Sequence, residues 1–88
     1  MTVREACLEF ARLLREVADG RMSAAEALAR RPQLAPGTAG VPVTWGSAVA
    51  KLEIEAEFPV LDEPATREAF AAEWRALADR LEARAPRA

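Results

Sequence analysis

The sequence predicts an all-α fold, a small antiparallel four-helix bundle with a long loop between the second and third helices. Apolar residues recur at intervals of three and four along most of the chain, capping residues stand where helices would begin, and residues 32–43 are rich in glycine and proline. A chain of 88 residues is long enough for one hydrophobic core and too short for two. We therefore expect a single helical domain over residues 1–88.

The first helix is predicted to begin after Thr2. Thr2 and Glu5 have the spacing of a capping box, in which each side chain satisfies a backbone N–H of the first turn. Apolar residues then follow on one stripe, namely Val3, Cys7, Phe10, Leu14 and Val17. Gly20 suits the left-handed conformation that often ends a helix, so we expect the helix to end just before it.

A short second helix is predicted over residues 24–30. Ser23 and Glu26 have the spacing of another capping box. Ala25 and Leu28 are expected to form the buried side of this helix, because they lie three residues apart.

Residues 44–58 fit two patterns. In a helix capped by Thr44, one stripe would contain Trp45, Ala48, Val49, Leu52 and Ala56. From Leu52 to Phe58, however, apolar residues alternate with three glutamates, which is the period of a half-buried strand. The alanine, glutamate, lysine and leucine content favours the helix, and the strand stays as an alternative.

The last helix is predicted to open at Asp62, Glu63 and Pro64, since acids favour the positive end of a helix and proline is tolerated in its first turn. Its apolar stripe would contain Phe70, Trp74, Leu77 and Leu81.

The predicted helices suggest two pairs. We expect a helical hairpin over residues 1–31, a loop over 32–43, a helical pair over 44–84 and a frayed tail over 85–88. Antiparallel packing would then bury a core of Phe10, Leu14, Leu28, Trp45, Leu52, Phe70, Trp74 and Leu77.

The residue types present argue against an enzyme. Histidine and tyrosine are both absent, so the commonest general base and metal ligand is missing. The only cysteine, Cys7, falls on the apolar stripe of the first helix and is expected to be a buried structural thiol. We therefore expect no catalytic residues, no metal and no cofactor.

The chain shows no membrane or nucleic-acid signal. No apolar run is long enough to span a membrane, and the charged residues at the N-terminus are unlike a signal peptide. Basic residues do not cluster with aromatic residues, which argues against nucleic-acid binding. A cytoplasmic bacterial protein is the expectation.

Acidic residues are concentrated in one segment. Residues 52–66 contain five acids and no base, whereas the flanking regions are slightly basic. The segment is either a solvated surface or a patch that binds a protein partner. The candidate partner-binding residues are Glu53, Glu55, Glu57, Phe58, Asp62 and Glu63. Ile54 and Phe58 are possible apolar anchors, with packing near Val60 and Leu61 as the alternative role.

This layout resembles the small four-helix immunity proteins of the colicin D type, which block a tRNA-cleaving toxin. The pieces that carry the resemblance are Leu8 to Leu14, Met22 to Leu28, Ala56-Glu57-Phe58, Asp62-Glu63 and Glu68 to Leu81. The resemblance implies a protein that fills the active cleft of a nuclease toxin with acidic groups, carried here by Glu53, Glu57, Asp62 and Glu63.

Two functions therefore follow as expectations. The first is an immunity-like inhibitor that neutralises a basic nuclease-type toxin through an acidic surface. The alternative is a homo-oligomeric helical adaptor or regulatory module, and two tryptophans in so short a chain favour a homodimer.

Overall fold

The computed structural model describes residues 1–58 and 64–87, and within these residues it contains four α-helices and no β-strand. The helices are α1 (Val3–Ala18), α2 (Ala24–Arg30), α3 (Val43–Glu57) and α4 (Pro64–Arg84). The all-helical fold class is confirmed. Residues 52–57 are helical, so the strand alternative is wrong, while the predicted opening of the last helix at Asp62 and Glu63 lies outside the described residues.

The first predicted cap is confirmed in detail. The Thr2 hydroxyl accepts a hydrogen bond from the Glu5 backbone N–H at 3.0 Å, and the Thr2 backbone N–H donates to Glu5 Oε1 at 2.9 Å. The pKa of Glu5 is lowered, chiefly because the Thr2 backbone N–H donates to its carboxylate and so favours the charged form. Gly20 has a φ of 73°, the left-handed value expected after the end of α1.

The structure differs from the prediction at two other N-caps, those expected at Ser23 and Thr44. Ser23 accepts from the Glu26 backbone N–H at 3.1 Å, but the Glu26 carboxylate pairs with Arg30 at 3.1 Å, so only one half of the second capping box is formed. α3 begins two residues earlier than a cap at Thr44 predicts, because Pro42 and not Thr44 is its N-cap residue. Thr44 is instead buried, and its hydroxyl accepts a hydrogen bond from Arg84 Nη1 at 3.2 Å.

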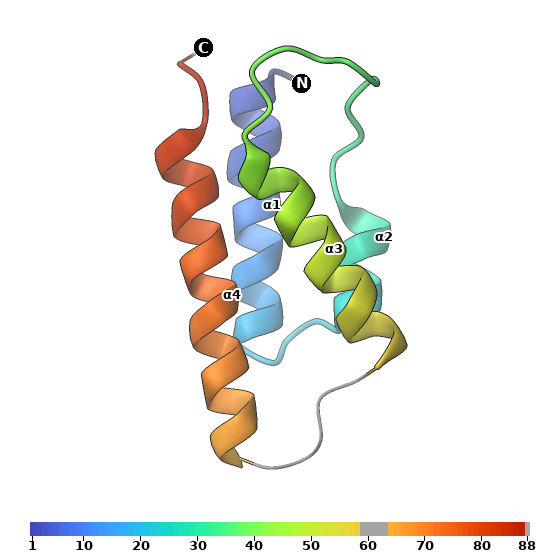
Figure 1. Cartoon of the computed structure of the whole chain (residues 1–88), viewed down its shortest axis with the longest axis vertical. Coiled ribbons are helices and arrows are strands. Elements are labelled where there is room, and N and C mark those ends of the chain that lie inside the picture. The colour runs from blue at the N-terminus through green and yellow to red at the C-terminus, as the bar shows by residue number, and fades with distance from the viewer. Residues whose placement is uncertain (59–63, 88) are drawn as a thin grey trace.

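α1 and α4 form the most extensive helix pair, and α2 packs mainly on α3 (Figure 1). Ion pairs show the register of the first pair. Arg15 pairs with Asp79 at 2.7 Å and also with Glu82. Asp19, the C-cap residue one turn after Arg15, pairs with Arg75, one turn before Asp79 in α4, at 2.9 Å. α1 and α4 therefore run in opposite directions, which places both ends of the chain at the same end of the molecule (Figure 1).

The core lies between the four helices. The most deeply buried large side chains are Phe10, Leu13, Leu14, Leu52 and Leu81. Of the predicted core, Phe10, Leu14, Leu52, Trp74 and Leu77 are buried, while Leu28, Trp45 and Phe70 are partly buried and pack against them. One expectation for α2 is wrong, because Ala24 and Ala27 are buried and Ala25 is exposed. A seven-residue helix with several alanines has more than one possible apolar side, and packing on α3 selects it.

Two aromatic contacts hold α3 on the other helices. The rings of Phe10 and Trp45 meet edge to face, with centroids 4.7 Å apart. Lys51 Nζ lies 4.8 Å from the ring centroid of Phe70 and 2.5 Å from Glu73 Oε2, so it links α3 to α4. These contacts determine which side of α3 faces the core.

Replacing Phe10 with alanine is expected to lower the free energy of unfolding by about 3–5 kcal/mol, because it leaves a cavity against Trp45. Phe58→Ala is the matched control. The Phe58 side chain is 69% exposed, so its loss is expected to change stability by less than about 0.5 kcal/mol. Urea unfolding followed by tryptophan fluorescence measures both. Equal effects of the two substitutions would show that Phe10 does not occupy the core.

Candidate protein-binding surface

One side of α3 packs on the core, and the other side is exposed to solvent. Thr44, Ala48 and Leu52 are buried on the inner side. The outer side consists of residues that are all exposed, and we call them the α3 outer face: Val43, Gly46, Ser47, Ala50, Glu53, Ile54, Glu57 and Phe58. The first seven belong to α3, and Phe58 is its C-cap residue.

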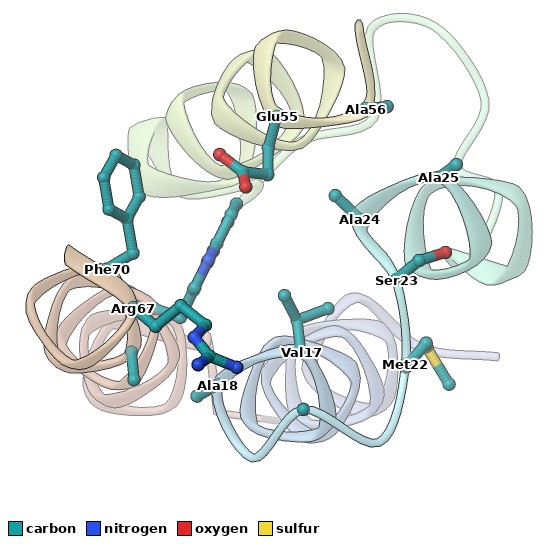
Figure 2. Close-up of a pocket in the computed structure, with 13 residues that line it drawn as sticks. Val17, Ala18, Met22, Ser23, Ala24, Ala25, Glu55, Ala56, Arg67 and Phe70 are labelled. Carbon is teal, nitrogen blue, oxygen red and sulfur yellow. The ribbon is translucent and has the colours of Figure 1, made fainter. Parts of the chain in front are cut away.

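The α3 outer face contains three of the six candidate residues. Glu53 and Glu57 lie one helical turn apart on it, next to Phe58. Glu55 does not join them. It is half-buried and points toward the space between the helices (Figure 2), because residues two apart on a helix face nearly opposite sides. Asp62 and Glu63 lie outside the described residues.

Large apolar side chains on this face are exposed to solvent. Ile54 is 63% exposed, Phe58 is 69% exposed, and Val43 at the opposite end of α3 is 86% exposed. Val60 and Leu61, the alternative packing partners of Ile54 and Phe58, lie outside the described residues. Val43 was missed by the sequence analysis, although a helical projection begun at residue 43 would have placed it in line with Ile54.

The acids of this face lack the pairing seen in other helices. Acids of α1, α2 and α4 mostly have a basic partner, as Glu9 does in Arg12 and Glu26 does in Arg30. Glu53 and Glu57 have no ion-pair partner among residues 1–58 and 64–87. Their carboxylates are therefore exposed to solvent and not tied up in a described ion pair.

A groove borders the α3 outer face on the side of α2. It has a volume of about 370 Å³. It is lined by residues that follow α2, namely Arg31, Pro32, Gln33 and Leu34, and by residues of α3, namely Trp45, Gly46, Val49, Ala50 and Glu53. Arg31 is partly held in place, because its Nη1 donates to the carbonyl oxygen of Leu28 at 2.7 Å. The face thus has a cation beside its middle and carboxylates toward its C-terminal end.

A second hollow lies between the ends of the four helices. This cavity of about 330 Å³ is lined largely by small residues, including Gly20, Ala18, Ala24, Ala25, Ala56 and Ala71. In Figure 2 the side chains of Val17 and Ala24 point into it, and Glu55 and Arg67 reach toward it from α3 and α4. Small side chains leave this end of the bundle incompletely filled.

The described part of the chain contains one thiol and no cluster of metal-ligating side chains. No group of three or more Cys, Asp or Glu side chains comes together there in a way that could hold a metal ion. Cys7 is completely buried, and burial raises the pKa of its thiol, which disfavours the reactive thiolate. In the same residues, no helix is long and apolar enough to cross a membrane.

Cys7 is expected to be protected from thiol reagents in the folded protein. At pH 8 an aromatic disulfide reagent should modify it at least about 100-fold more slowly than in urea, because the reagent needs an exposed thiolate. The absorbance of the released thiolate measures the rate. Similar rates with and without urea would contradict the buried position of Cys7.

Filling the cavity is expected to stabilise the fold. Ala24→Leu should raise the free energy of unfolding by about 0.5–2 kcal/mol, since it adds apolar volume where little packs now. Ala29→Leu, at an exposed position of the same helix, is the control and should change stability by less than about 0.5 kcal/mol. Thermal unfolding by circular dichroism compares them, and a loss of stability on Ala24→Leu would mean that the cavity is already filled.

Comparison of the chain with protein-family models, with curated proteins and with solved structures finds no match. The α3 outer face and its chemistry are therefore the basis for any inference about function.

Proposed function

We propose that this protein is a cytoplasmic binding module whose α3 outer face docks on the basic surface of another protein. The observation that carries the proposal is the combination of Glu53 and Glu57, which are unpaired in the described chain, with the exposed side chains of Ile54 and Phe58. Charged groups at a surface steer a partner of opposite charge, and apolar anchors provide most of the binding energy once the surfaces meet.

The expected role is inhibition of a nuclease-type toxin. Clefts that bind nucleic acid are lined with lysine and arginine, because these side chains neutralise phosphates. Carboxylates one turn apart on a helix can occupy such a cleft in place of phosphates. The resemblance to colicin D-type immunity proteins supports this role. In this proposal the four helices act as an antiparallel bundle that holds α3 rigid, so little ordering entropy is lost on binding.

A second candidate function is a homo-oligomeric helical adaptor. Val43 favours it, because this 86% exposed side chain extends the apolar surface to the N-terminal end of α3, far from the acids. A surface with apolar residues along its whole length suits a partner helix of similar length. Trp74 does not contribute, since it is buried in the core.

Glu57→Lys is expected to weaken binding to a basic partner by at least about tenfold, and Phe58→Ala by a similar factor, because they remove a steering charge and an anchor. Glu68→Lys makes the same charge change at an exposed position of α4 and should alter binding by less than about twofold. Tagged wild type and variants can be used to capture proteins from the source cell, with quantitative mass spectrometry as the measurement.

The result that supports the inhibitor is enrichment of a protein with a basic nuclease domain that the Glu57 and Phe58 variants lose and the Glu68 variant keeps. Raising the salt concentration should weaken the capture, since the charges are exposed. If the same partner is captured equally by all variants, the α3 outer face is not the binding surface.

A further inference from the structure

The α3 outer face is self-complementary, so that the same face of a second copy can pack on it. Among the described residues five large hydrophobic side chains are exposed, and three of them, Val43, Ile54 and Phe58, lie on this face. They flank a shallow middle made of Gly46, Ser47 and Ala50. An apolar helix face that no other described part of the chain covers can dock another helix.

Residue size changes along the face about a centre at Ala50. Gly46 lies four residues before Ala50 and Ile54 four residues after it, so each is about 6 Å from the centre along the axis. In an antiparallel pair of identical helices that crosses at Ala50, Ile54 of each copy comes opposite Gly46 of the other. Gly46 has no atom within 4 Å of the position where a Cβ would be, so a side chain can approach its backbone.

The charges of Glu53 and Arg31 are also complementary between two antiparallel copies. A two-fold axis between antiparallel helices keeps the α2 side of one copy next to the α2 side of the other. Glu53, Gly46 and Arg31 all line the groove on that side. The rotation therefore brings Glu53 of one copy toward the groove that holds Arg31 of the other, and it does so twice.

Parallel pairing lacks these features. It would place Ile54 against Ile54, leave Gly46 facing Gly46, and set the like charges of Glu53 and Glu57 side by side, which is unfavourable. It would also align the dipoles of the two helices in the same direction, whereas antiparallel helices place opposite partial charges together.

We infer that two copies of this chain associate through α3, antiparallel about a two-fold axis at Ala50, with Ile54 of each copy on Gly46 of the other and Glu53 of each near Arg31 of the other. This inference rests on the second candidate function. One helix pair buries less surface than a permanent interface, so the dimer is a weak one, formed in the micromolar to millimolar range. A basic protein would compete with the second copy for the same face.

Ala50→Arg tests the two-fold centre. It places two like charges against each other at the axis, on an exposed helical position where arginine is well tolerated. Ala72→Arg makes the same change at an exposed position of α4 and is the control. Sedimentation velocity over about 1 µM to 1 mM should show a dimer for wild type and Ala72→Arg, and at least a tenfold weaker dimer for Ala50→Arg. Circular dichroism should show that both variants are folded.

A charge exchange tests the orientation. Arg31→Glu and Glu53→Arg should each weaken the dimer by about three- to tenfold, because each places like charges together. The double variant restores opposite charges at both contacts, so its dissociation constant should return to within about twofold of wild type. If the double variant is weaker than either single variant, the antiparallel register is wrong.

The outcomes separate this inference from the functions on which it draws. A wild-type chain that stays monomeric up to about 1 mM overturns both the dimer and the adaptor function, and leaves the binding of a basic partner unaffected. A wild-type dimer that Ala50→Arg does not weaken overturns the α3 geometry alone.

Discussion

The structure depends on burying one side of α1. Phe10 and Leu14 are completely buried, and Cys7 lies one turn earlier on the same stripe. α4 covers part of this stripe in an antiparallel pairing that ion pairs at Arg15 and Asp19 keep in register. α2 also packs on α1, and α3 reaches this side through the contact of Trp45 with the ring of Phe10. Because apolar burial is the main favourable term in folding, this requirement outweighs local preferences elsewhere in the chain.

The α3 outer face is a consequence of that requirement. Once Leu52 faces the core and Trp45 meets the ring of Phe10, the rotation of α3 about its axis is determined. With α3 in this orientation, the side chains of Ile54 and Phe58 do not point toward the core. Both side chains therefore stay exposed at the surface of the described chain. Exposed groups of this kind in a small domain are suited to binding, whether the partner is a basic protein or a second copy.

Small side chains have two different effects in this chain. At one end of the bundle, alanines such as Ala24 and Ala56 allow the helices to come together but leave a cavity that larger residues would fill. On the outside of α3, Gly46 and Ala50 make a shallow surface onto which another helix can pack closely. The same residue types therefore cost stability inside the molecule and permit docking outside it.

The sequence alone determined the helical character of the chain, the capping box at Thr2, the end of α1 at Gly20 and most of the core, because these features depend on spacings within one or two helical turns. It also indicated where acids and apolar residues share a segment. Only the tertiary structure decided that Glu55 turns inward while Glu53 and Glu57 stay outside, that Thr44 is buried against Arg84 rather than capping a helix, and that Ala24 rather than Ala25 packs inside. Periodicity defines which residues share a face, but which face is covered depends on helices that lie far away in the chain.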